Sequence, residues 1–126
     1  MTAALATAGL AGVQVIRDEA ATPRLLVVLV APSTALRQCD AAVGNAVLAG
    51  VVMVTCQVDV EDDMVTFAVG DVLRTIDDAT VDYPGLPIVV VGHGDAAAVA
   101  SVAADACGDD ISGLVLTHQR PTFQAA

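Results

Sequence analysis

The sequence predicts a single α/β domain in which a mainly parallel sheet of four to five strands lies between two layers of helices. The chain has 126 residues, which is about the length of one domain. Short apolar runs alternate with segments of helical period, as in parallel strands joined by helices. Hydrophobic residues make up 56% of the chain and aromatic residues 2%, which excludes disorder and predicts a core of alanine, valine and leucine. We expect the domain at residues 12–121, between a loose N-terminal segment at 1–11 and a tail at 122–126.

Four apolar runs are expected to form the strands of the sheet. They are rich in valine, leucine and isoleucine and show no polar alternation, which is typical of strands buried on both faces. The four runs are Leu25–Ala31, Val51–Val58, Ile88–Val91 and Ile111–Leu116. A further strand is expected at Gly12–Arg17.

Three helices are expected between these strands. The first covers Ser33–Ala49, with Ser33 as the N-cap and Gly50 just past its end. The second covers Asp62–Asp78, where apolar and charged residues fall on opposite sides, so we expect one exposed face. The third covers Asp95–Cys107 and is nearly all alanine and valine, so we expect it to pack closely on the sheet.

The order of these elements predicts where a ligand would bind. If the chain winds both ways from Leu25–Ala31, that strand is central and the switch in winding direction falls between it and Ile88–Val91. Ligands of open α/β sheets bind beyond the carboxyl ends of the strands at this point. The residues expected to line the cleft are Pro32, Ser33, Thr34, His93, Gly94, Asp95 and His118.

The stretch LPIVVVGHGDAA at 86–97 resembles the nucleophile elbow of the α/β-hydrolase superfamily. In that family a strand ends in G-x-S-x-G, and a helix of small residues follows. Gly92 and His93 fit the frame, but Gly94 stands where the family has its nucleophile. The resemblance therefore implies the fold of a hydrolase together with the loss of its nucleophile.

The resemblance covers about residues 12–121 and comes closest to small dienelactone-hydrolase-like domains. The family's oxyanion loop is replaced by APST at 31–34, where Pro32 lacks the N–H that an oxyanion hole needs. Along this alignment the sequence ends after the strand at Ile111–Leu116, before the family's acid and catalytic histidine. The resemblance implies that two further members of the catalytic triad are absent.

Each candidate residue also has a structural interpretation, which we favour. His93 is expected to pack beside the sheet and His118 to lie on the surface. Asp95 and Ser33 are expected to be helix N-caps, and no motif pairs Ser33 with a base. The acidic run at 59–63 lacks the glycine and spacing of a calcium loop, so a solvated acidic face is expected and no metal site.

Charge and cysteine content limit the partners and the compartment. With 15 acidic and 5 basic residues the net charge is −10, which excludes nucleic acid and anionic membrane surfaces. The apolar stretch Ala41–Val58 is interrupted by Gly44, Asn45 and Gly50, so it does not predict a membrane span. The three cysteines have no C-x-x-C spacing, so we expect buried thiols in a cytoplasmic protein. No cofactor is expected, because no G-x-G-x-x-G opens a helix and no aromatic residue is placed to stack on a ring.

Two functions remain in competition. The first is a catalytically inactive α/β-hydrolase-like protein that acts by binding a small molecule or by assembly. The alternative is a small hydrolase or other enzyme on a flavodoxin-like sheet, which would use Ser33, His93, Asp95 and His118. A receiver-type signalling domain is excluded, since Ala31-Pro32 replaces its acidic pair and the chain has no lysine.

A homodimer is the expected assembly. The family's sheet continues beyond its sixth strand, so the resemblance implies that Ile111–Leu116 is left as an apolar edge. Soluble proteins cover or pair such edges, and a two-fold symmetric dimer is the simplest way to do so.

Overall fold

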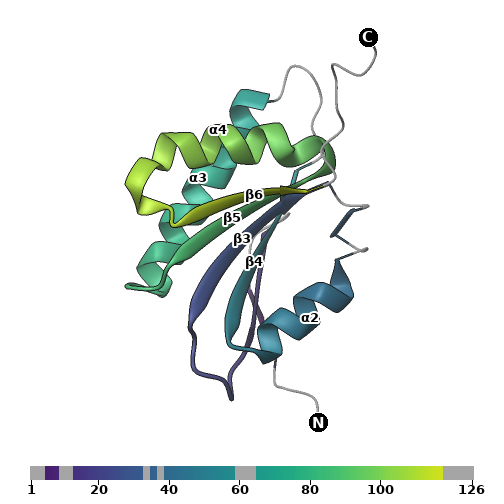
Figure 1. Ribbon diagram of the computed structural model, residues 1–126, viewed down its shortest axis with the longest axis vertical. Helices are drawn as coiled ribbons and strands as arrows, with labels where there is room; N and C mark the ends of the chain where they lie inside the picture. Colours follow the sequence, from purple (N-terminus) through teal and green to yellow (C-terminus); the bar gives the residue numbers. More distant parts are fainter. Residues whose placement is uncertain (1–4, 9–12, 33–34, 37–38, 59–64, 118–126) are drawn as a thin grey trace.

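The sheet separates one helix from two others (Figure 1). The computed structural model describes residues 5–8, 13–32, 35–36, 39–58 and 65–117. Helices α3 and α4 lie on one side of the sheet and α2 on the other (Figure 1). In chain order the elements are β1 (Leu5–Ala8), β2 (Val13–Asp18), β3 (Leu25–Ala31), α2 (Asp40–Leu48), β4 (Val51–Gln57), α3 (Val65–Asp82), β5 (Ile88–His93), η2 (Gly94–Ala96), α4 (Ala97–Cys107), η3 (Gly108–Asp110) and β6 (Gly113–Thr117).

The sheet is mixed, with strand order β1-β2-β4-β3-β5-β6. Strands β4, β3, β5 and β6 are parallel, whereas β1 and β2 run antiparallel to their neighbours. The prediction of an α/β fold is confirmed, and β3 is central, with β4 on one side and β5 on the other. The described sheet has six strands, more than the four to five expected.

The additional strand lies within the segment that was expected to be loose. Leu5–Ala8 form β1, which pairs antiparallel with β2. Only four residues separate the two strands, and so short a connection joins antiparallel neighbours. The remainder of the predicted N-terminal segment, 1–4 and 9–11, and the predicted tail, 122–126, lie outside the described residues, as do 118–121 at the end of the predicted domain.

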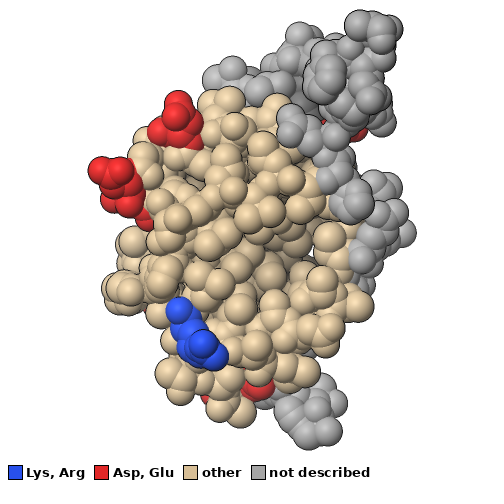
Figure 2. Space-filling view, in the orientation of Figure 1, with Lys and Arg blue, Asp and Glu red and all other residues tan. Residues whose placement is uncertain are grey.

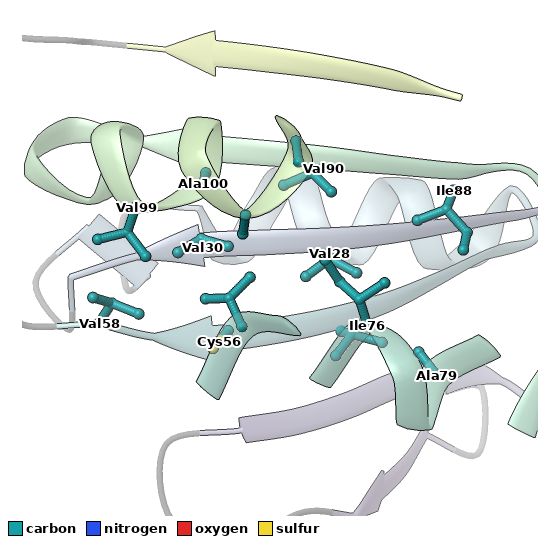
Figure 3. Close-up of a cluster of buried hydrophobic side chains, with 14 of the residues drawn as sticks. Val28, Val30, Cys56, Val58, Ile76, Ala79, Ile88, Val90, Val99 and Ala100 are labelled. Atoms are coloured by element: carbon teal, nitrogen blue, oxygen red, sulfur yellow. The ribbon is translucent and has the colours of Figure 1, made fainter. Parts of the chain in front are cut away.

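Side chains of β3 alternate between two buried layers, which explains its uninterrupted apolar sequence. Leu26, Val28 and Val30 face α3 and α4, where they pack with residues such as Ile76 and Val99 (Figure 3). Leu29 faces the opposite way and packs with residues of α2 and β4, namely Val43, Val47 and Met53. The core predicted from valine and leucine is therefore confirmed for the central strands.

Strand β6 does not follow the prediction of burial on both faces. Leu114 is 40% exposed, Val115 46% and Leu116 36%. The cause is the position of β6, because it is the outermost strand of the described sheet and pairs there with β5 alone. In addition, α2 packs against β4 and β2 rather than against this end of the sheet.

The helix boundaries differ from those expected at three places. Helix α2 begins at Asp40 instead of Ser33, although Ala35 and Leu36 within the predicted range are also helical and the Cys39 N–H donates to the Ala35 carbonyl at 3.1 Å. Helix α3 continues to Asp82, and Pro84 follows two residues later, as expected for a helix end. The third helix opens with the 3₁₀ turn η2 before α4.

Among the helices of the described residues, none is both long and apolar enough to cross a membrane.

Candidate functional site

Strand β5, turn η2 and helix α4 form a tight strand–turn–helix at the carboxyl edge of the sheet. Strand β5 ends at His93, η2 covers the next three residues, and α4 begins at Ala97. The turn lies beside the end of β3, because β3 and β5 are parallel neighbours. The predicted reversal of winding direction between β3 and β5 is therefore confirmed, and a ligand cleft at this point stays a prediction.

Close packing at this turn requires glycine at position 92. A Cβ on Gly92 would lie 2.6 Å from the Ala100 Cβ and 2.9 Å from the Ala97 Cα. It would also lie 3.1 Å from Cδ2 of Leu116 on the neighbouring strand. Ala97 and Ala100 of α4 are buried, and their small side chains allow the helix to pack directly against the ends of β5 and β6.

Gly94 occupies a different environment from Gly92. Its φ is +63°, in the left-handed region that side chains rarely adopt. Among the atoms of the described residues, a Cβ at this position would meet none closer than Cγ of Pro32, at 3.9 Å. The described residues thus leave room for a side chain at Gly94, which itself carries no nucleophilic atom.

The side chain of His93 is held by the neighbouring strand. Its Nδ1 lies 2.7 Å from Oγ1 of Thr117, the register partner of His93 on β6. Both side chains are half-buried, and the ring tautomer decides which atom donates the hydrogen bond. The expectation that His93 packs beside the sheet agrees with this contact.

Thr117 is the site residue that the sequence analysis did not find. The sequence contains a signal for it, since a hydroxyl at the end of one parallel strand faces a histidine at the end of the next. That signal becomes usable only when the register His93↔Thr117 is known. The predicted strand at Ile111–Leu116 ended one residue too early to include it.

Of the predicted oxyanion loop at 31–34, the structure describes Ala31, which ends β3, and Pro32. Pro32 lies against the turn at Gly94. Its carbonyl oxygen accepts hydrogen bonds from the N–H groups of Ala35 and Leu36, each at 3.0 Å. Ser33, Thr34 and His118 lie outside the described residues, as does the acidic run at 59–63. Of the seven predicted cleft residues, the structure thus describes Pro32, His93, Gly94 and Asp95.

Asp95 is not a helix cap, and this prediction is wrong. It lies inside the 3₁₀ turn η2, where its side chain is exposed. The N-cap of η2 is His93 and that of α4 is Ala96, and neither makes a side-chain capping hydrogen bond. The reason is the extra turn between strand and helix, which moves the start of α4 two residues past Asp95.

The cysteines form no site in the described structure. None of the three makes a disulfide, and only Cys56 is buried, whereas Cys39 and Cys107 are half-buried. Burial raises the pKa of the Cys56 thiol; a hydrogen bond with Thr75 opposes this rise and the charge of Asp71 adds to it. Burial, with the charges of Asp77 and Asp110, also raises the pKa of Cys107, so neither thiol is activated. Within the described residues, no group of three or more His, Cys, Asp or Glu side chains is placed to hold a metal ion.

Comparison with solved structures identifies the fold of this chain. A thermostable carboxyl esterase from Bacillus coagulans matches 92% of this chain over 44% of its own length, with a TM-score of 0.63 and 19% identity. A hyperthermophilic esterase from Pyrobaculum calidifontis matches 91% of this chain over 45% of its length, with a TM-score of 0.65 and 19% identity. The fold is that of the α/β-hydrolases.

The match extends to other α/β-hydrolase structures. The thioesterase domain from the curacin biosynthetic pathway matches 94% of this chain over 45% of its length, with a TM-score of 0.55 and 16% identity. This chain spans less than half of the length of each of these three proteins. No family model matches the chain, and no curated protein matches its sequence.

The turn at Gly94 can be compared with the corresponding turn of the α/β-hydrolase fold. In α/β-hydrolases a strained turn between strand and helix holds the nucleophile above the sheet. In this chain the corresponding turn between β5 and α4 has close packing at Gly92 and a positive φ at Gly94.

Proposed function

We propose that this chain is a catalytically inactive α/β-hydrolase-like protein that acts by binding or by assembly. The observation that carries the proposal is Gly94, which has a φ of +63° and, among the described residues, space for a side chain, but no nucleophilic atom. Loss of the nucleophile reduces the rate of such enzymes by about 10⁴–10⁶-fold, which leaves little activity for selection to retain.

One further feature of the described residues supports this proposal. Pro32, next to the elbow, has no N–H to offer to an oxyanion. A cytoplasmic location belongs to the same proposal and is supported by three cysteines that form no disulfide.

The assembly we propose is a homodimer, and the cleft beside Pro32 and Gly94 is the proposed place for a small-molecule ligand. No nucleic acid partner is proposed, because the chain carries a net charge of −10.

A second candidate function is favoured by one contact. Thr117 Oγ1 and His93 Nδ1 are 2.7 Å apart, which is within the distance over which a base activates a hydroxyl nucleophile. A small hydrolase built on this pair would attack with a threonine from β6 instead of a residue at the elbow. Such an enzyme would fit the alternative drawn from the sequence, with Thr117 added to it.

A screen with short-chain p-nitrophenyl esters separates the two functions. The inactive protein releases p-nitrophenol no faster than buffer alone. Turnover that is lost in Thr117→Val and in His93→Gln would contradict the proposal and support the threonine enzyme. Gly70→Ala is a suitable control, because Gly70 is exposed, lies on α3 and has open space around it.

A further inference from the structure

We draw no further inference here: the strongest candidate, the open groove of about 490 Å³ between helix α4 and strand β6 on the largely uncharged face shown in Figure 2, carries nothing, because nothing among the described residues shows what covers it.

Discussion

Replacing Gly92 and Gly94 separately by alanine tests the two properties that define the elbow. At Gly92 the added methyl group would lie 2.6 Å from the Ala100 Cβ, whereas an ordinary van der Waals contact is 3.4 Å or more. The contact with the Ala97 Cα, at 2.9 Å, involves the backbone and cannot be relieved by a rotamer change. At Gly94 the same methyl group meets no described atom closer than 3.9 Å, and the positive φ opposes it.

These distances predict different losses of stability. Gly92→Ala overpacks a buried contact, which costs about 1–3 kcal/mol, and the rigid backbone contact places it at the upper end. Gly94→Ala forces a side chain into the left-handed region, which costs about 1–2 kcal/mol. Because urea m-values are about 1–3 kcal/mol/M, Gly92→Ala is expected to lower the unfolding midpoint by about 1–2 M.

Urea unfolding followed by circular dichroism measures both variants. Ala100→Gly provides the matched second mutation, because it removes the atom nearest to the new methyl group. In a double-mutant cycle, Ala100→Gly should be less harmful in Gly92→Ala than in the wild type, with a coupling of about 0.5–3 kcal/mol. If Gly92→Ala were no less stable than Gly94→Ala, or the cycle showed no coupling, the proposed packing of α4 on β5 would be refuted.

Two further predictions concern the elbow and the core. Gly94→Ser is expected to fold with about the stability of Gly94→Ala. It is expected to remain without esterase activity, because a serine needs a paired base and the imidazole of His93 contacts Thr117. Ester turnover in this variant would show that a base is in place. Burial is the main cause that raises the pKa of Cys56 above 9.0, so the folded protein favours the neutral thiol. The stability that comes from this preference is fully present below pH 9.0 and is lost as the pH rises through the raised pKa of the folded protein. Above pH 9.0, Cys56→Ala should therefore lose stability less steeply than the wild type in urea titrations, and parallel curves for the two proteins would contradict the assignment.

The central part of the fold could be predicted because local sequence and burial agree there. The range Leu25–Ala31 is both the predicted run and the observed β3, since a strand buried on both faces must be apolar throughout. Gly50 marks the end of α2 as expected and has a φ of +97°. The exposed face of α3, with Asp71, Arg74 and Asp78, was also visible from its periodicity.

Other features depend on contacts between distant segments, which the sequence does not display. Leu5–Ala8 became a strand because β2 offered an edge, and nothing in those four residues alone predicts pairing. Asp95 has the composition of an N-cap, but the 3₁₀ turn places it elsewhere. The contact of Thr117 with His93 required the register between β5 and β6, and the exposure of Val115 required knowing which strand lies at the edge.

The absence of a nucleophile at Gly94 could be predicted from one position of a motif. The structure adds that Gly94 has a φ of +63° and that the described residues leave space for a side chain there. Close packing of α4 on the sheet at Gly92 explains why the turn is tight.

Ester hydrolysis by the purified chain is the most direct test of its proposed inactivity. The measurement is the initial rate of p-nitrophenol release from acetate and butyrate esters, for the wild type, Thr117→Val and a buffer blank. We expect the three rates to be the same within error for both esters. A wild-type rate well above the blank that falls to the blank in Thr117→Val would contradict the proposal and assign the chain a threonine-dependent hydrolase activity.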